Sequence, residues 1–157
     1  MADENTKRAA QEYLASRLSE EGLTYEETQN RDAAVALASV VWKKVVQTVM
    51  TQCHDWNDVT GERTFTCKET LLGDLRILCA GRSHQMTVHF DSKKRLILVK
   101  NTARLEHEPE VILGIEGYAT ETGRDARVVR NNKPVNVEML ILGQLRVLAG
   151  LNRDAKT

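Results

Sequence analysis

The spacing of hydrophobic residues changes from helical to alternating near residue 63 of this chain. Between residues 31 and 57 apolar positions recur every three or four residues, which is typical of an amphipathic helix. The stripe consists of Val35, Ala38, Trp42, Val45, Val49, Gln52 and Trp56, and it holds both tryptophans of the chain. At 1.5 Å per residue this helix would be about 40 Å long, which exceeds the width of a small domain.

Two shorter features precede the long stripe. Residues 5–21 predict a first helix with a narrow apolar face, and Gly22 fits its left-handed end, where Leu23 would contact Leu18. Thr24 and Glu27 have the spacing of a capping box, so a new helix is expected to begin there. Residues 30–32 are poor helix formers and favour a kink or break before the long stripe.

From residue 63 onward, apolar and polar residues alternate with a period of two, which predicts strands. The sequence predicts about six, over residues 65–67, 75–79, 86–90, 96–99, 111–119 and 126–131. Residues 96–99 (Leu-Ile-Leu-Val) are apolar on both faces. That strand is therefore expected to be central, or covered on its second face by the C-terminal helix or by a second subunit.

Residues 132–134 (Asn-Lys-Pro) are expected to start a C-terminal helix over 133–149. Its apolar face is formed by Val137, Leu140, Ile141, Leu145 and Leu148. The whole chain, 1–157, is then one α+β domain: helical over 5–58, sheet over 63–131, then the C-terminal helix. We expect the long amphipathic helix to pack on a mostly antiparallel sheet, with Trp42, Val45, Val49 and Trp56 against Met86, Val88 and Phe90.

The charge balance narrows the classes of partner. The 157 residues carry 22 basic and 22 acidic side chains, so the net charge is zero. This gives no general attraction to nucleic acid or to an anionic membrane. No apolar run approaches the roughly 20 residues of a membrane span, and the polar start has no signal-peptide core. We expect a cytoplasmic protein with no specific nucleic-acid or membrane partner, and three reduced cysteines.

The residues that could support catalysis or metal binding do not form a recognisable set. Cys53 and His54 are adjacent on a helix, and His84 and His89 would face opposite sides of one strand, so no zinc site is expected. Cys67 and Cys79 share the inward phase of their strands, where a thiol is usually inert. No glycine-rich phosphate loop is present, and no cofactor is expected. Whether the protein is an enzyme stays open, with the sequence leaning against it.

Two groups of residues remain as candidate binding sites. His84, His89 and His107 could line a pocket. A possible basic patch consists of Lys93, Lys94, Arg95, Arg124, Arg127 and Arg130. Because Arg127 and Arg130 lie in opposite strand phases, these side chains need not form one surface. Charges on exposed strands also protect a sheet from aggregation, which is the simpler interpretation.

Two hypotheses about function follow. The first is a non-enzymatic cytosolic interaction or assembly module, expected to form a homodimer; whether it also binds another protein stays open. It rests on a helical stripe longer than such a sheet can cover, because exposed apolar stripes of that size are uncommon on soluble monomers. The alternative is a small-molecule-binding protein or enzyme with a pocket between the long helix and the sheet.

Overall fold

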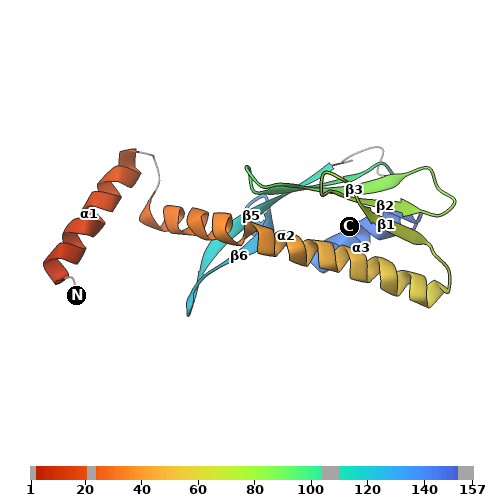
Figure 1. Cartoon of the computed structure of the whole chain (residues 1–157), viewed down its shortest axis with the longest axis horizontal. Coiled ribbons are helices and arrows are strands. Elements are labelled where there is room, and N and C mark those ends of the chain that lie inside the picture. Colours follow the sequence, from red (N-terminus) through yellow and green to blue (C-terminus); the bar gives the residue numbers. More distant parts are fainter. Residues whose placement is uncertain (1–2, 21–23, 104–109, 152–157) are drawn as a thin grey trace.

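The computed structural model describes residues 3–20, 24–103 and 110–151. Two helices come first, then a continuous antiparallel sheet, then a last helix, which confirms the predicted α+β class (Figure 1). The elements are α1 (Glu4–Glu20), α2 (Tyr25–Thr60), β1 (Phe65–Glu69), β2 (Leu75–Cys79), β3 (Gln85–Asp91), β4 (Leu96–Asn101), β5 (Glu110–Thr120), β6 (Gly123–Arg130), β7 (Lys133–Pro134) and α3 (Val137–Leu148). The sheet thus has seven strands where about six were expected.

The strands lie side by side in the order in which they occur in the chain, each antiparallel to its neighbours. The doubly apolar β4 is the fourth of seven and therefore central, one of the two arrangements expected for it. Val88, Val99 and Val111 are opposite one another on β3, β4 and β5, and all three are buried on the inward face. This inward row continues into the core that the helices cover.

Helices α2 and α3 cover the same face of the sheet (Figure 1). The buried residues of α2 are Ala34, Ala38, Val41, Val45, Val49 and Cys53. They recur every three or four positions, as expected, but begin one residue earlier than predicted, and Val35 is 57% exposed. The buried stripe runs from Ala34 to Cys53, and contacts with the sheet continue to Asn30 at one end and to Asn57 at the other.

Both tryptophans of α2 flank the buried stripe and contact phenylalanines of the sheet. Trp42 stacks on Phe90 with ring centroids 5.4 Å apart, and Trp56 meets Phe65 edge-on at 4.9 Å. The predicted packing of Trp42 against the sheet is confirmed. Neither tryptophan is fully buried, because each covers the margin of the core rather than its centre.

Replacement of Trp42 by alanine is expected to lower the free energy of unfolding by about 2 kcal/mol. This value reflects the loss of the stacked ring pair and of part of the buried area of Trp42. It is smaller than the loss expected for a fully buried tryptophan. Urea titration followed by circular dichroism measures the change. A loss under roughly 0.5 kcal/mol would show that Trp42 does not contact Phe90 in solution.

The predicted break at residues 30–32 is wrong, because α2 continues without interruption from Tyr25 to Thr60. The capping interaction at its start is present: the Thr24 hydroxyl accepts a hydrogen bond from Glu27 N at 3.1 Å. Asn30 is held by the sheet, since Arg124 donates to its side-chain oxygen and Gly117 of β5 lies against its backbone carbonyl. Tertiary contacts thus override the low helix propensity of this segment.

The predicted start of the last helix at residue 133 is also wrong. Asn131 and Asn132 both have positive φ, 53° and 64°, which makes the two-residue turn of a hairpin. Pro134 consequently lies in β7, opposite Val129 of β6. Helix α3 begins three residues later, where the Asn136 side chain accepts a hydrogen bond from Met139 N.

One buried polar pair joins α3 to the central strand. Asn101, at the end of β4, is 1% exposed, and Gln144 of α3 is 3% exposed. The Asn101 amide donates to the main-chain oxygen of Gln144 at 3.0 Å and to its side-chain oxygen at 3.1 Å. Its own side-chain oxygen accepts from Ala103 N at 3.1 Å. These bonds fix the position of α3 along the sheet.

By length and composition alone, α2 contains a stretch apolar enough to cross a membrane, contrary to the expectation from the sequence. Core helices of soluble proteins pass the same test. In this structure the helix covers the sheet, and its apolar stripe is part of the core. This is weak evidence about location.

Candidate functional site

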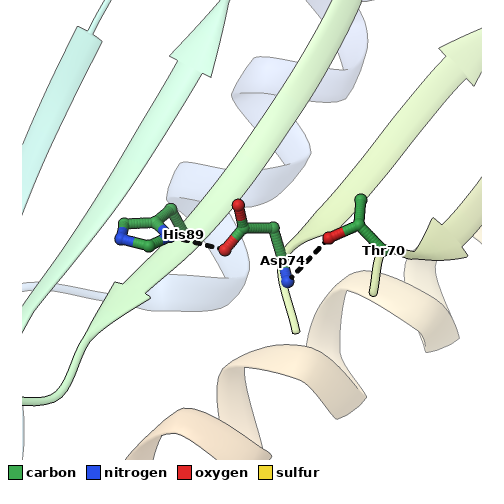
Figure 2. Close-up of polar contacts among 3 residues, drawn as sticks. All are labelled: Thr70, Asp74 and His89. Atoms are coloured by element: carbon green, nitrogen blue, oxygen red, sulfur yellow. Dashed lines mark hydrogen bonds and ion pairs between the residues drawn. The ribbon is translucent and has the colours of Figure 1, made fainter. Parts of the chain in front are cut away.

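His89 forms the closest polar pair on the sheet face that the helices leave open. Its Nδ1 lies 2.5 Å from the Oδ1 of Asp74, and Figure 2 shows the Asp74 carboxylate directed at the imidazole ring. A carboxylate only accepts, so Nδ1 carries the proton. On the other side of Asp74, its main-chain N–H donates to the Thr70 hydroxyl at 3.2 Å.

This arrangement resembles the base-and-orienter half of a catalytic triad, but it lacks a nucleophile. The Thr70 hydroxyl is separated from the imidazole by Asp74 (Figure 2). Thr70 also closes the turn between β1 and β2, because its main-chain oxygen accepts a hydrogen bond from Gly73 N. His89 does not line either of the two grooves at the edges of α2. The pair therefore ties the β1–β2 turn to β3, which is a structural role.

The other two candidate histidines do not join His89. His84 precedes β3 at the opposite end of that strand, where its Nδ1 lies 3.4 Å from the Thr102 hydroxyl. His107 lies outside the described residues, as does the predicted contact between Leu18 and Leu23. The structure thus brings no two of the candidate histidines together among the residues it describes.

The candidate basic patch is divided between three environments. Lys93, Lys94 and Arg95 occupy the β3–β4 turn, where Asp91 accepts from the main-chain N–H groups of both lysines. These bonds, above all that from Lys94, lower the pKa of the Asp91 carboxyl below its ordinary value. Arg124 instead bonds Asn30 of α2 on the covered face.

Arg127 points to the open face. Its Nε lies 3.8 Å from Glu116 Oε2, and its Cζ lies 4.4 Å from the centre of the Tyr118 ring. Arg130 lies further along β6. The six basic residues therefore form no continuous surface for a nucleic-acid backbone.

The cysteines behave as core residues. Cys53 and Cys79 are buried, Cys67 is partly buried, and all three are free thiols. A hydrogen bond to Cys67, together with burial, raises the pKa of Cys53, while the same bond lowers that of Cys67. Within the described ranges, no three His, Cys, Asp or Glu side chains are placed to hold a metal ion.

The open face of the sheet mixes apolar and polar side chains. Leu98 lies between His89 and Ile112, and Ile112 is 56% exposed. Lys100 stands opposite Thr87 and Glu110 in the next row. One solvated face of this mixed kind is usual for an antiparallel sheet.

Two grooves open at the edges of α2. The first, between the end of α2 and α3, has a volume of about 460 Å³ and is mostly apolar; we call it the α2–α3 groove. It is lined by Gln52, Asp55, Trp56, Val59, Thr60 and Leu142. The second, of about 450 Å³, lies where α2 meets β6 and the start of α3, and it includes Lys44, Thr48, Asn136 and Glu138; we call it the β6 groove.

The described side chains of helix α1, up to residue 16, take no part in the core. The helix projects away from the sheet at the N-terminal end of α2, which it contacts (Figure 1). All its described side chains are exposed, including Tyr13 at 66% and Leu14 at 39%. In proteins most helix stability comes from tertiary packing, so the described part of α1 gains little stability from its own chain. The sequence showed the narrow apolar face of this helix but not that Tyr13 and Leu14 on it are exposed.

No known protein family, curated protein or solved structure was found to match this chain.

Proposed function

We propose that this protein is a non-enzymatic interaction module of the cytoplasm that assembles with a second copy of itself. The observation that carries the proposal is the exposure of α1. A helix whose described side chains are all exposed contributes little to the stability of its own chain, and a binding role accounts for it better. Exposed apolar side chains near the two ends of α2, Tyr25 at 49% and Val59 at 89%, support the same proposal.

Sedimentation equilibrium on the full chain at micromolar concentration tests the proposal. A dimer is expected, with a mass twice 17.7 kDa. The double variant Tyr13→Glu/Leu14→Glu should shift the protein toward monomer without changing the fold of the monomer, read as an unchanged near-UV circular dichroism spectrum, because both side chains are exposed. A mass of 17.7 kDa that does not rise with concentration would contradict the proposal.

The β6 groove gives specific support to a second candidate, small-molecule binding beside the long helix. Its volume suits a small ligand, and Lys44 and Glu138 supply charged groups at its edge. Thermal-shift screening with a panel of metabolites tests it. Stabilisation by one compound, lost in the groove-filling variant Thr48→Trp, would favour this candidate, and the absence of any stabilisation would count against it.

A further inference from the structure

We infer that the α2–α3 groove is the docking site for helix α1 of a second copy of this chain. This inference rests on the proposed self-association and names the two surfaces involved. Among the described residues, Tyr13 and Leu14 form an exposed apolar face on α1, and the α2–α3 groove is mostly apolar. These two surfaces fit each other and cannot meet within one chain.

The groove is formed by side chains that the core leaves exposed. Val59 is 89% exposed and lies one turn from Trp56, whose ring packs edge-on against Phe65. Leu142 faces them from α3, and Met139, one turn away on that helix, is 64% exposed. Exposed apolar residues grouped around a hollow are typical of a helix-binding surface.

Helix α1 carries a matching face. Ala10, Tyr13 and Leu14 have the i, i+3, i+4 spacing by which a helix presents its residues to a groove. Alanine permits close approach of the helix, while Tyr13 and Leu14 provide the area to be buried. This face has a partner of suitable size in the groove.

The charges at the edges are complementary. Lys7 lies in line with Ala10 and Leu14 along α1, and its ion pair with Glu4 is exposed and 4.0 Å long. The groove contains Asp55, which is exposed, and Asp58 lies beside it in an exposed pair with His54. Such pairs add orientation and specificity to a contact whose affinity comes from apolar burial.

Helix α1 cannot reach the groove of its own chain. From Tyr25 to Gln52, the nearest groove residue, α2 extends about 40 Å at 1.5 Å per residue. Even with residues 21–24 fully extended, Tyr13 lies no more than about 28 Å from Tyr25. The groove that receives Tyr13 must therefore belong to another molecule.

A twofold arrangement uses both surfaces completely. Each copy has one α1 and one α2–α3 groove at opposite ends of α2, so two antiparallel copies can exchange their helices reciprocally. This contact closes on itself and leaves no unused site that would extend the assembly into a filament.

The test compares two exposed valines of α2 by sedimentation equilibrium of the full chain. Val59→Lys introduces a charge into the groove, whereas Val40→Lys introduces the same charge at a position 45% exposed and outside it. The dimer dissociation constant should rise at least tenfold for Val59→Lys and less than twofold for Val40→Lys. Unchanged far-UV and near-UV circular dichroism spectra at about 20 °C for both variants exclude misfolding as the cause.

A charge exchange provides a second, independent measurement. Lys7→Glu and Asp55→Lys should each raise the dissociation constant, and the double variant should recover most of the loss. Dimers that persist unchanged in Val59→Lys would refute the groove assignment and leave self-association standing. A wild-type chain that stays monomeric at every concentration would refute both.

Discussion

Replacement of Gly117 by alanine is expected to lower the free energy of unfolding by about 3 kcal/mol, even though alanine suits a strand better than glycine does. A Cβ at this position would collide with the Asn30 carbonyl and lie 3.0 Å from the Cβ of Ala33. Both groups belong to the N-terminal half of α2, whose backbone cannot move aside without lifting the helix from β5 and β6. The cost is therefore near the upper end for overpacking.

Gly143 in α3 provides the matched control. A Cβ there would meet no atom within 4 Å, and alanine favours a helix over glycine. Gly143→Ala is thus expected to raise the free energy of unfolding by about 0.5–1 kcal/mol. Chemical denaturation of both variants measures the two changes. If Gly117→Ala were as stable as the wild type, α2 would not lie against β5 at this point.

This close approach also explains which features of α2 could be predicted. Periodicity identified a helix packed on the sheet, but it ranked positions by hydrophobicity and so assigned Val35 to the buried side. The structure buries Ala34 instead, which is 2% exposed. Where a helix approaches a strand closely at a glycine, only small side chains fit between them, and hydrophobicity no longer ranks the positions.

The remaining errors have a similar origin. The Asn30 region was predicted to break the helix because its propensity is low, and long-range contacts from β5 and β6 keep it helical. Pro134 was assigned to a helix start, a position that proline favours, but two asparagines before it form a hairpin turn. The α2–α3 groove could not be predicted, because the relative position of these two helices depends on tertiary contacts that no local sequence pattern encodes.

The buried joint between β4 and α3 gives the largest pH-dependent effect that we expect. In Asn101→Asp, a carboxylate replaces an amide that donates to two oxygens of Gln144. The carboxylate would then be buried against two acceptors, with Ala103 N as the donor that bonds it in the native chain. At pH 7 the free energy of unfolding is expected to fall by about 4 kcal/mol.

The sign of the pH dependence follows from the same geometry. Burial against oxygen acceptors disfavours the ionised form, so the folded-state pKa of this aspartate must exceed its value in the unfolded chain. The folded state then binds a proton more tightly, and the variant regains stability as the pH falls from about 7 toward about 5. A protonated carboxyl can again donate one hydrogen bond to Gln144.

Asn101→Leu separates charge from the loss of hydrogen bonds. This variant removes the same donors without introducing an ionisable group. Its free energy of unfolding is expected to lie about 3 kcal/mol below that of the wild type, by the same amount at pH 7 and at pH 5. Urea titrations of the wild type and the two variants at pH 7 and pH 5 make the comparison. If the free energies of unfolding of Asn101→Asp and Asn101→Leu changed equally between pH 7 and pH 5, residue 101 would be hydrated. Helix α3 would then not be fixed to the sheet by hydrogen bonds that are shielded from water.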